Sequence, residues 1–196
     1  ETKPGVESVE AEVATQAMID FALNLKTASE YTVYAERGIT EKGNSEIRGT
    51  KGDAMRTAEG RKSTKELSNS IAALRQLPCS ELKGGELAGK VFTPGVYCLN
   101  SAELNGEMVI DGQGSAAGAY IFRVAGTLNA KSGSSIRLEN GAQGGNVYFV
   151  AENAEIGNDV AFRANVLASG NIKIGSGSTV TNKVLATGSV ELDNSA

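Results

Sequence analysis

Apolar residues near the start of the chain recur three and four positions apart, which is the spacing of one face of a helix. They are Val9, Val13, Ala14, Ala17, Met18, Phe21, Ala22 and Leu25. Pro4 and Gly5 precede this stripe, and residues 27–29 follow it. We therefore predict an amphipathic helix within residues 1–28. Its apolar stripe needs a partner, so we expect it to cap one end of the following domain or to form a dimer contact.

A second helical stripe predicts a helix over residues 64–77. Its apolar positions are Leu67, Ile71 and Leu74. Ser63 and Glu66 have the spacing of a capping box at its start. Pro78 follows it and is expected to end it.

Short strands alternate with Gly and Asn corners from about residue 86 to the end, and residues 30–52 also alternate in this way. Three similar phrases recur 19 and 18 residues apart, at 146–151, 165–170 and 183–188. Each phrase is followed by two further short strands. Three strands per repeat predict a right-handed β-solenoid of triangular section, with coils stacked about 4.8 Å apart.

Alternate positions of these strands are apolar and are expected to fill a central column. They are Val147, Phe149, Ile156, Phe162, Val166, Ile172, Ile174, Val180, Val184, Val190 and Leu192. On one of the three faces the outward positions are also apolar, at Tyr97, Leu99, Ile121, Tyr148, Val150, Leu167 and Leu185. Strands that are apolar on both sides must be covered on both sides. We expect the helix over 64–77, about 21 Å long, to cover this face.

Composition excludes several classes of function. The chain contains no His, so it has neither a His-dependent catalytic triad nor a His-containing zinc site. Lys and Arg number 19 against 23 Asp and Glu, with no basic cluster, so we expect neither nucleic acid nor a membrane as a partner. No apolar run is long enough to cross a bilayer. No tight cluster of acids and bases points to catalysis, and we expect no enzyme activity, no cofactor and no metal.

The chain has two cysteines, Cys79 just after the second helix and Cys98 in the first full coil. A disulfide would tie the end of the helix to that coil. Two buried free thiols are an equally good interpretation of the same positions.

Several phrases resemble, in order, those of the bacterial and fungal ice-binding proteins built on a discontinuous β-helix. They lie at 93–97, 119–128, 141–143, 146–148, 166–168 and 184–186. The segment 28–52 is similar to the first coil of that family, so the resemblance covers 28–196. It implies about six coils, one long flanking helix and a first coil docked near the C-terminal coil. We divide the chain into an N-terminal helix, 1–28, and an ice-binding-like solenoid domain, 29–196.

The resemblance places the ice-binding face on the strands that follow the helix-covered ones. Its candidate residues here are Thr127, Asn129, Asn153, Glu155, Asn171, Lys173, Ser189 and Glu191. With Glu103, the mid-strand positions form a ladder rich in charge, which is also compatible with an ordinary solvated face. The third face offers Ser135, Arg137, Arg163, Thr179 and Thr181 as an alternative, although its Thr residues are also ordinary strand formers.

The sequence favours a secreted, non-enzymatic binder of crystalline water that inhibits growth or recrystallisation of ice. Because the candidate face carries charge, we expect weak activity on ordinary ice, and a gas clathrate hydrate is a second lattice of the same class. The alternative is a cell-surface or matrix adhesion module that binds polysaccharide or protein. Its binding would depend on Glu155, Lys173 and Glu191 and would weaken in salt.

Overall fold

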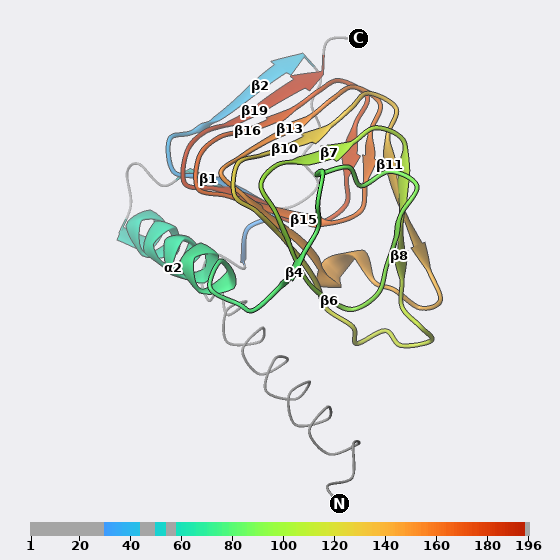
Figure 1. Cartoon of the computed structure of the whole chain (residues 1–196). Helices are drawn as coiled ribbons and strands as arrows, with labels where there is room; N and C mark the ends of the chain where they lie inside the picture. Colours follow the sequence, from blue (N-terminus) through green and yellow to red (C-terminus); the bar gives the residue numbers. More distant parts are fainter. Residues whose placement is uncertain (1–29, 44–49, 54–57, 195–196) are drawn as a thin grey trace, which may run out of the picture.

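The computed structural model describes residues 30–43, 50–53 and 58–194 of the 196-residue chain. The predicted helix over 1–28 lies outside these residues, and so does the role proposed for it. The described chain is mainly β, with three parallel sheets and the helix α2 (Ala58–Leu74) beside one of them (Figure 1).

From β6 (Gly95–Leu99) to β19 (Val190–Asn194), successive strands along the chain join sheets A, B and C in turn, so that each full coil adds one strand to each sheet. Sheet A contains, in spatial order, β3 (Lys51–Asp53), β1 (Val33–Ala35), β18 (Val184–Ala186), β15 (Asn165–Ala168), β12 (Val147–Ala151), β9 (Tyr120–Val124), β6 (Gly95–Leu99) and β4 (Ser80–Glu81). Sheet B contains β2 (Ile39–Gly43), β19 (Val190–Asn194), β16 (Ile172–Ile174), β13 (Asn153–Ile156), β10 (Thr127–Ala130) and β7 (Ala102–Leu104). Sheet C contains β17 (Thr179–Val180), β14 (Ala161–Phe162), β11 (Ser135–Glu139), β8 (Glu107–Asp111) and β5 (Val91–Phe92). A short 3₁₀ helix, η2 (Gly144–Asn146), precedes β12.

The first coil docks on the last one. Strand β1 pairs with β18, and β2 pairs with β19, although about 150 residues of sequence separate the partners. This confirms the expected contact between the first and the C-terminal coil. Sheet B, with six strands in the described chain, agrees with the expected number of coils.

One apolar core lies between the three sheets. Every residue predicted for the central column belongs to it, with Val180 partly buried at its margin. Aromatic rings stack along the column: Phe122 and Phe149 lie 4.5 Å apart between ring centroids, and Phe162 follows at 5.2 Å from Phe149. Adjacent rungs are one strand spacing apart, about 4.8 Å, which is the distance at which aromatic rings stack.

Helix α2 covers the outer side of sheet A, as predicted. Leu67, Ile71 and Leu74 pack there in a second apolar cluster. The sheet contributes Ile121, Val150, Leu167 and Leu185. Because each of these strands is apolar on both sides, the helix removes the second side from water.

The predicted helix bounds were wrong at both ends. The helix begins at Ala58 and ends at Leu74, so the capping box is wrong too: Ser63 lies inside the helix and is buried. The early start is held by Tyr34 of β1, whose hydroxyl donates to the Gly60 carbonyl at 2.8 Å. This tertiary contact stabilises a first turn that has no apolar stripe of its own.

The predicted orientation of β6 was also wrong. Val96 packs in the cluster under α2, whereas Leu99 and Tyr97 pack against the solenoid core. The register with β9 pairs Val96 with Ile121 and Tyr97 with Phe122. Because β6 is apolar on both sides, its sequence does not distinguish two registers that differ by one residue, and such a shift exchanges the two faces.

A disulfide joins Cys79 to Cys98, with their Cα atoms 5.7 Å apart. The structure therefore selects the bridge over the two free thiols. It fastens the segment after α2 to β6, at the end of the stack where β4 is the last strand of sheet A. In the described residues, no helix has the length and apolarity that crossing a bilayer requires.

Candidate functional site

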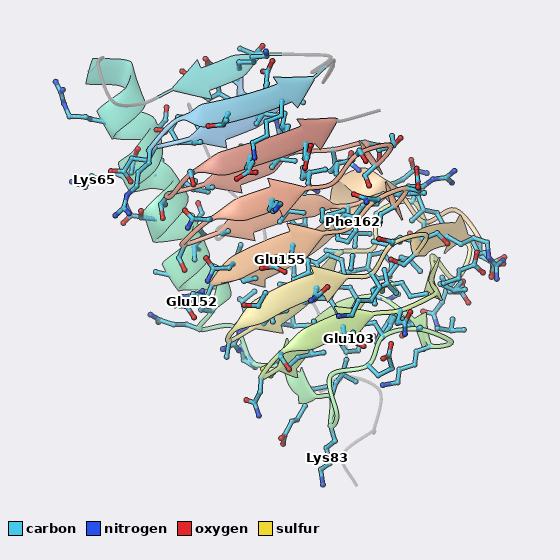
Figure 2. The ribbon with its side chains drawn as sticks, turned by 90° about the horizontal axis from the view of Figure 1, so that it is seen from above. Lys65, Lys83, Glu103, Glu152, Glu155 and Phe162 are labelled. Atoms are coloured by element: carbon cyan, nitrogen blue, oxygen red, sulfur yellow. A yellow bond between two sulfur atoms is a disulfide. The ribbon has the colours of Figure 1, made fainter. Side chains whose placement is uncertain are left out.

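On the outer face of sheet B, the mid-strand side chains form an unbroken, in-register ladder, of which Figure 2 labels Glu103 and Glu155. Its members, in spatial order, are Glu103, Asn129, Glu155, Lys173, Glu191 and Thr40. The structure therefore brings together the mid-strand residues predicted from the sequence. Thr40 was missed, because its place beside Glu191 follows from the docking of β2 on β19 and has no local signal.

Two of the acidic residues on this ladder form ion pairs with the neighbouring row of side chains. Lys42 Nζ lies 2.6 Å from Glu191 Oε1, and Lys131 Nζ lies 3.5 Å from Glu103 Oε2. The hydrogen bond and charge of Lys42 lower the pKa of the Glu191 carboxyl, and Glu191 in turn raises the pKa of Lys42. These groups are exposed, so such pairs contribute little to stability.

The middle of the ladder is different. Glu155 and Lys173 are paired in register on β13 and β16, and both are exposed. Among the described residues, neither forms an ion pair within 4.0 Å. Two long charged side chains thus lie in the centre of sheet B without an ion pair to another described residue, although the charge of Lys173 helps to lower the pKa of Glu191.

The corner between sheets A and B holds the second row of predicted residues. Asn153 Oδ1 accepts the backbone N–H of Asn171 at 2.9 Å, and Asn171 Oδ1 accepts that of Ser189 at 2.9 Å. The Ser189 hydroxyl also donates to Asn171 Oδ1, at 3.0 Å. Thr127 begins this row, paired in register with Asn153. These side chains lie along the stack and bind one coil to the next, so the structure gives them a definite structural role.

The other two corners use the same device. Asn158 Oδ1 accepts the backbone N–H of Ser176 at 3.1 Å. The buried Asn165 accepts that of Lys183 at 3.2 Å and donates to the Gly145 and Val147 carbonyls. Asparagine side chains therefore fix the coil spacing at all three corners, and the face of sheet B is held in a regular arrangement.

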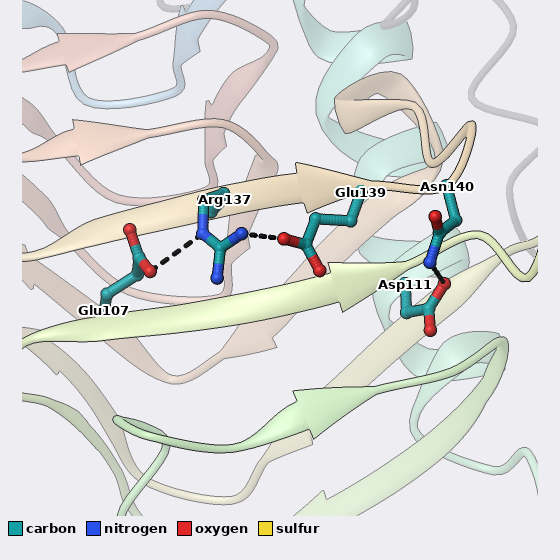
Figure 3. Close-up of polar contacts among 5 residues, drawn as sticks. All are labelled: Glu107, Asp111, Arg137, Glu139 and Asn140. Carbon is teal, nitrogen blue, oxygen red and sulfur yellow. Dashed lines mark hydrogen bonds and ion pairs between the residues drawn. The ribbon is translucent and has the colours of Figure 1, made fainter.

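Sheet C presents the alternative set of residues. Ser135 and Thr179 belong to one row through Ala161. Arg137 is held between two carboxylates: its Nε lies 2.8 Å from Glu107 Oε1, and a second nitrogen pairs with Glu139 (Figure 3). Arg163 directly follows β14 and Thr181 directly follows β17, and both are exposed.

Side-chain hydrogen bonds also join the end of β8 to the residue after β11. Asn140 donates to Asp111 Oδ1 at 2.8 Å (Figure 3), and the Gln113 backbone N–H donates to the same oxygen, also at 2.8 Å. These hydrogen bonds lower the pKa of Asp111. The ion pairs, and three strands of only two residues among the five described, make sheet C less regular than sheet B. In the described part of the chain, no group of three or more His, Cys, Asp or Glu side chains is arranged to hold a metal ion.

Comparisons with known proteins point to one family. The model of the ice-binding-like family matches residues 11–196. An ice-binding protein of Nostoc sp. (strain HG1) is 35% identical over 111 residues, and one of Flavobacterium frigoris (strain PS1) is 33% identical over 112 residues. These stretches cover 56% and 57% of this chain but only 40% of each relative.

The fold is likewise shared with a solved structure of an ice-binding protein from the Antarctic ascomycete Antarctomyces psychrotrophicus. The two superpose with a TM-score of 0.81 and 27% identity. The match covers 86% of this chain and 94% of the fungal chain.

Proposed function

Because this chain belongs to the ice-binding-like family, we propose that it adsorbs to ice through the outer face of sheet B and inhibits crystal growth or recrystallisation. The observation that carries the proposal is the unbroken register of six parallel strands, which repeats one outward side chain per coil from Glu103 to Thr40. A lattice is periodic, so a surface that adsorbs to it must repeat as well. Sheet B is the most regular face that the described chain offers outside the helix-covered one.

Rigidity supports the same face. The asparagine rows at the corners hold each coil against the next, so little conformational freedom remains to be lost on adsorption. Short side chains form the row of Thr127, Asn153, Asn171 and Ser189 at the corner between sheets A and B, and Asn129 and Thr40 add two short side chains to the mid-strand ladder. We propose that these residues order the water layer that joins the lattice.

The free charges of Glu155 and Lys173 act against strong adsorption. Each holds water in its own geometry, and desolvating a charge is costly. We therefore expect weak inhibition of ordinary ice. A clathrate hydrate, whose water cages differ from the ice lattice, is the second lattice that we propose for this face.

The disulfide supports secretion. Bridges of this kind persist outside the cell, whereas cytosolic thiols are kept reduced. The bond between Cys79 and Cys98 therefore favours an extracellular or cell-surface protein.

The same central charges favour a second function, adhesion to a charged polysaccharide or protein. Glu155 and Lys173 are exposed and free of ion pairs among the described residues, so they are available to a polymer of alternating charge. Binding of that kind weakens as salt screens the charges, whereas adsorption through short polar side chains does not.

The test is the growth of a single ice crystal in a solution of this protein, with a parallel crystal of tetrahydrofuran hydrate. We expect faceting and a measurable gap between the melting and growth temperatures. The width of this gap should not depend on added salt. A round, freely growing crystal of both lattices contradicts the proposal. An effect that disappears in salt would favour the adhesion function instead.

A further inference from the structure

A cleft of about 980 Å³ lies at the disulfide end of the molecule, where Glu103 begins the ladder of sheet B. Its walls are the segment after α2, which carries Cys79 and Lys83, and the ends of β6 and β9. The side chains of Arg75 and Arg123 line it together. Nothing in the proposed adsorption to ice uses this cleft.

Arg123 stands in the row of side chains that passes beneath α2, in register with Val150. One of its terminal nitrogens donates to the Leu77 carbonyl, and the same nitrogen lies 3.0 Å from Cys79 Sγ. Its Nε is buried and has no acceptor. Burial lowers the pKa of this guanidinium, and the charge of Arg75, which lines the same cleft, lowers it further.

Arg75 approaches the cleft from the turn that follows α2. One terminal nitrogen donates to the Ser169 hydroxyl at 3.1 Å, and its Nε is likewise buried without an acceptor. Neither arginine forms an ion pair among the described residues. Two guanidinium groups therefore line one cleft, and neither is paired with a carboxylate of the described chain.

The lining adds charge of the same sign. Lys83 supplies a third cation, and Glu81 is the only acid among the lining residues, so the cleft carries an excess of positive charge. Capping the end of α2 explains the contact from Arg123 to Leu77. It explains neither the two unsatisfied Nε groups nor the pairing of like charges.

The walls of the cleft are fixed. The bridge from Cys79 to Cys98 forms one side, and the Leu82 N–H donates to the Cys98 carbonyl at 2.9 Å. Gly85 has a φ of 73° and lies against the Ser101 carbonyl, where a Cβ would clash. A ligand that enters would meet groups that are already in place, which lowers the entropy lost on binding.

We propose that this cleft binds an oxyanion, a carboxylate or sulfate group, between the Arg75 and Arg123 guanidinium groups. Planar guanidinium groups bind such oxygens in pairs of parallel, charge-assisted hydrogen bonds. The anion neutralises the repulsion between the two cations and accepts hydrogen bonds from the terminal N–H groups that face the cleft. The oxyanion is either a free anion or a group carried on an acidic sugar chain.

The test is titration of the full chain with sodium sulfate at constant ionic strength, followed by the Nε–H NMR signals of its arginines and by calorimetry. Saturable shifts of the Arg75 and Arg123 signals are expected. Arg75→Gln, which keeps the contact between Arg123 and Leu77, should weaken sulfate binding by about tenfold or more, since each charged hydrogen bond is strong. Arg61→Gln, on the exposed surface of α2, is the matched control and should bind as the wild type does.

Galacturonate and trigalacturonate then separate the two sources. Tighter binding of the trimer assigns the oxyanion to a sugar chain, and equal binding assigns it to a free anion. The proposal is overturned if sulfate produces no saturable shift, or if Arg75→Gln binds sulfate as tightly as the wild type. A protein that binds sulfate but does not inhibit ice growth would contradict only the proposed function, so the two failures are distinguishable.

Discussion

Replacing Gly188 by Ala tests whether close contact between coils keeps sheet B regular. A Cβ at this position would lie 2.7 Å from the Gly170 carbonyl carbon and would also clash with the Gly170 oxygen and with Asn171 Oδ1. Backbone atoms cannot give way as a flexible side chain can, so β16 and β19 must separate locally. That separation stretches the two hydrogen bonds that Ser189 donates to Asn171 Oδ1.

The cost follows from these two effects. Overpacking costs about 1–3 kcal/mol, and each weakened hydrogen bond contributes up to about 1 kcal/mol. We expect Gly188→Ala to lower the free energy of unfolding by about 3 kcal/mol, and the melting temperature by about 6–12 °C for a chain of this size. Urea unfolding monitored by circular dichroism measures the change.

Gly145→Ala is the matched control. Its Cβ would have no heavy atom nearer than Asn182 Oδ1, at 3.8 Å, which is ordinary contact. Its stability should stay within about 1 kcal/mol of the wild type. Equal unfolding free energies for the two variants would refute the idea that contact at the corners sets the coil spacing.

Three further changes are predicted. Replacing both Cys79 and Cys98 by Ser should lower the free energy of unfolding by about 3 kcal/mol, because the disulfide no longer restricts the conformational freedom of the unfolded chain. Equal urea midpoints for variant and wild type would contradict this. Phe149→Ala should cost about 3–5 kcal/mol in the same assay, because the ring is fully buried between two others, and a loss below 1 kcal/mol would count against the stacked column. Glu191 has a pKa lowered by Lys42, so this pair stabilises the fold above the ordinary glutamate pKa, and the contribution is lost as pH falls through the lowered value. Lys42→Gln should therefore raise the Glu191 pKa in an NMR titration, and an unchanged pKa would exclude the pair in solution.

The sequence was sufficient to predict the solenoid core, because inward positions repeat coil after coil and each repetition supports the same register. Phe149 and Val166 occupy equivalent places one coil apart, and both are buried as expected. The orientation of β6 was wrong because Val96, Tyr97, Cys98 and Leu99 offer no polar residue to mark the outer side. The start of α2 was wrong because a contact from Tyr34 decides it.

The candidate face was predicted in part. Mid-strand positions such as Glu155 and Lys173 follow from alternation within one coil. Thr40 does not, because it joins the ladder only when the first coil docks on the last one. Asn153 and Asn171 were predicted as members of this face, but their hydrogen bonds to the next coil were not, since an Asn beside a short strand gives the same sequence signal whether it faces solvent or binds the next coil.

The charged cleft had no signal in the sequence. Arg75 follows a helix and Arg123 lies in a strand, 48 positions further along the chain. Their proximity depends on how α2 lies across sheet A, and no local pattern contains that information.

Two tyrosine variants test most directly the central claim that sheet B is the adsorbing face. Asn129→Tyr puts a bulky ring on the sheet B ladder, between Glu103 and Glu155, and Thr179→Tyr puts the same ring on an exposed strand of sheet C. The freezing gap of a single ice crystal is measured in each variant at equal concentration, after unfolding curves show that both fold as the wild type does. The account predicts that Asn129→Tyr abolishes most of the gap and that Thr179→Tyr preserves it. A gap that survives in Asn129→Tyr and disappears in Thr179→Tyr would contradict the claim and assign adsorption to sheet C.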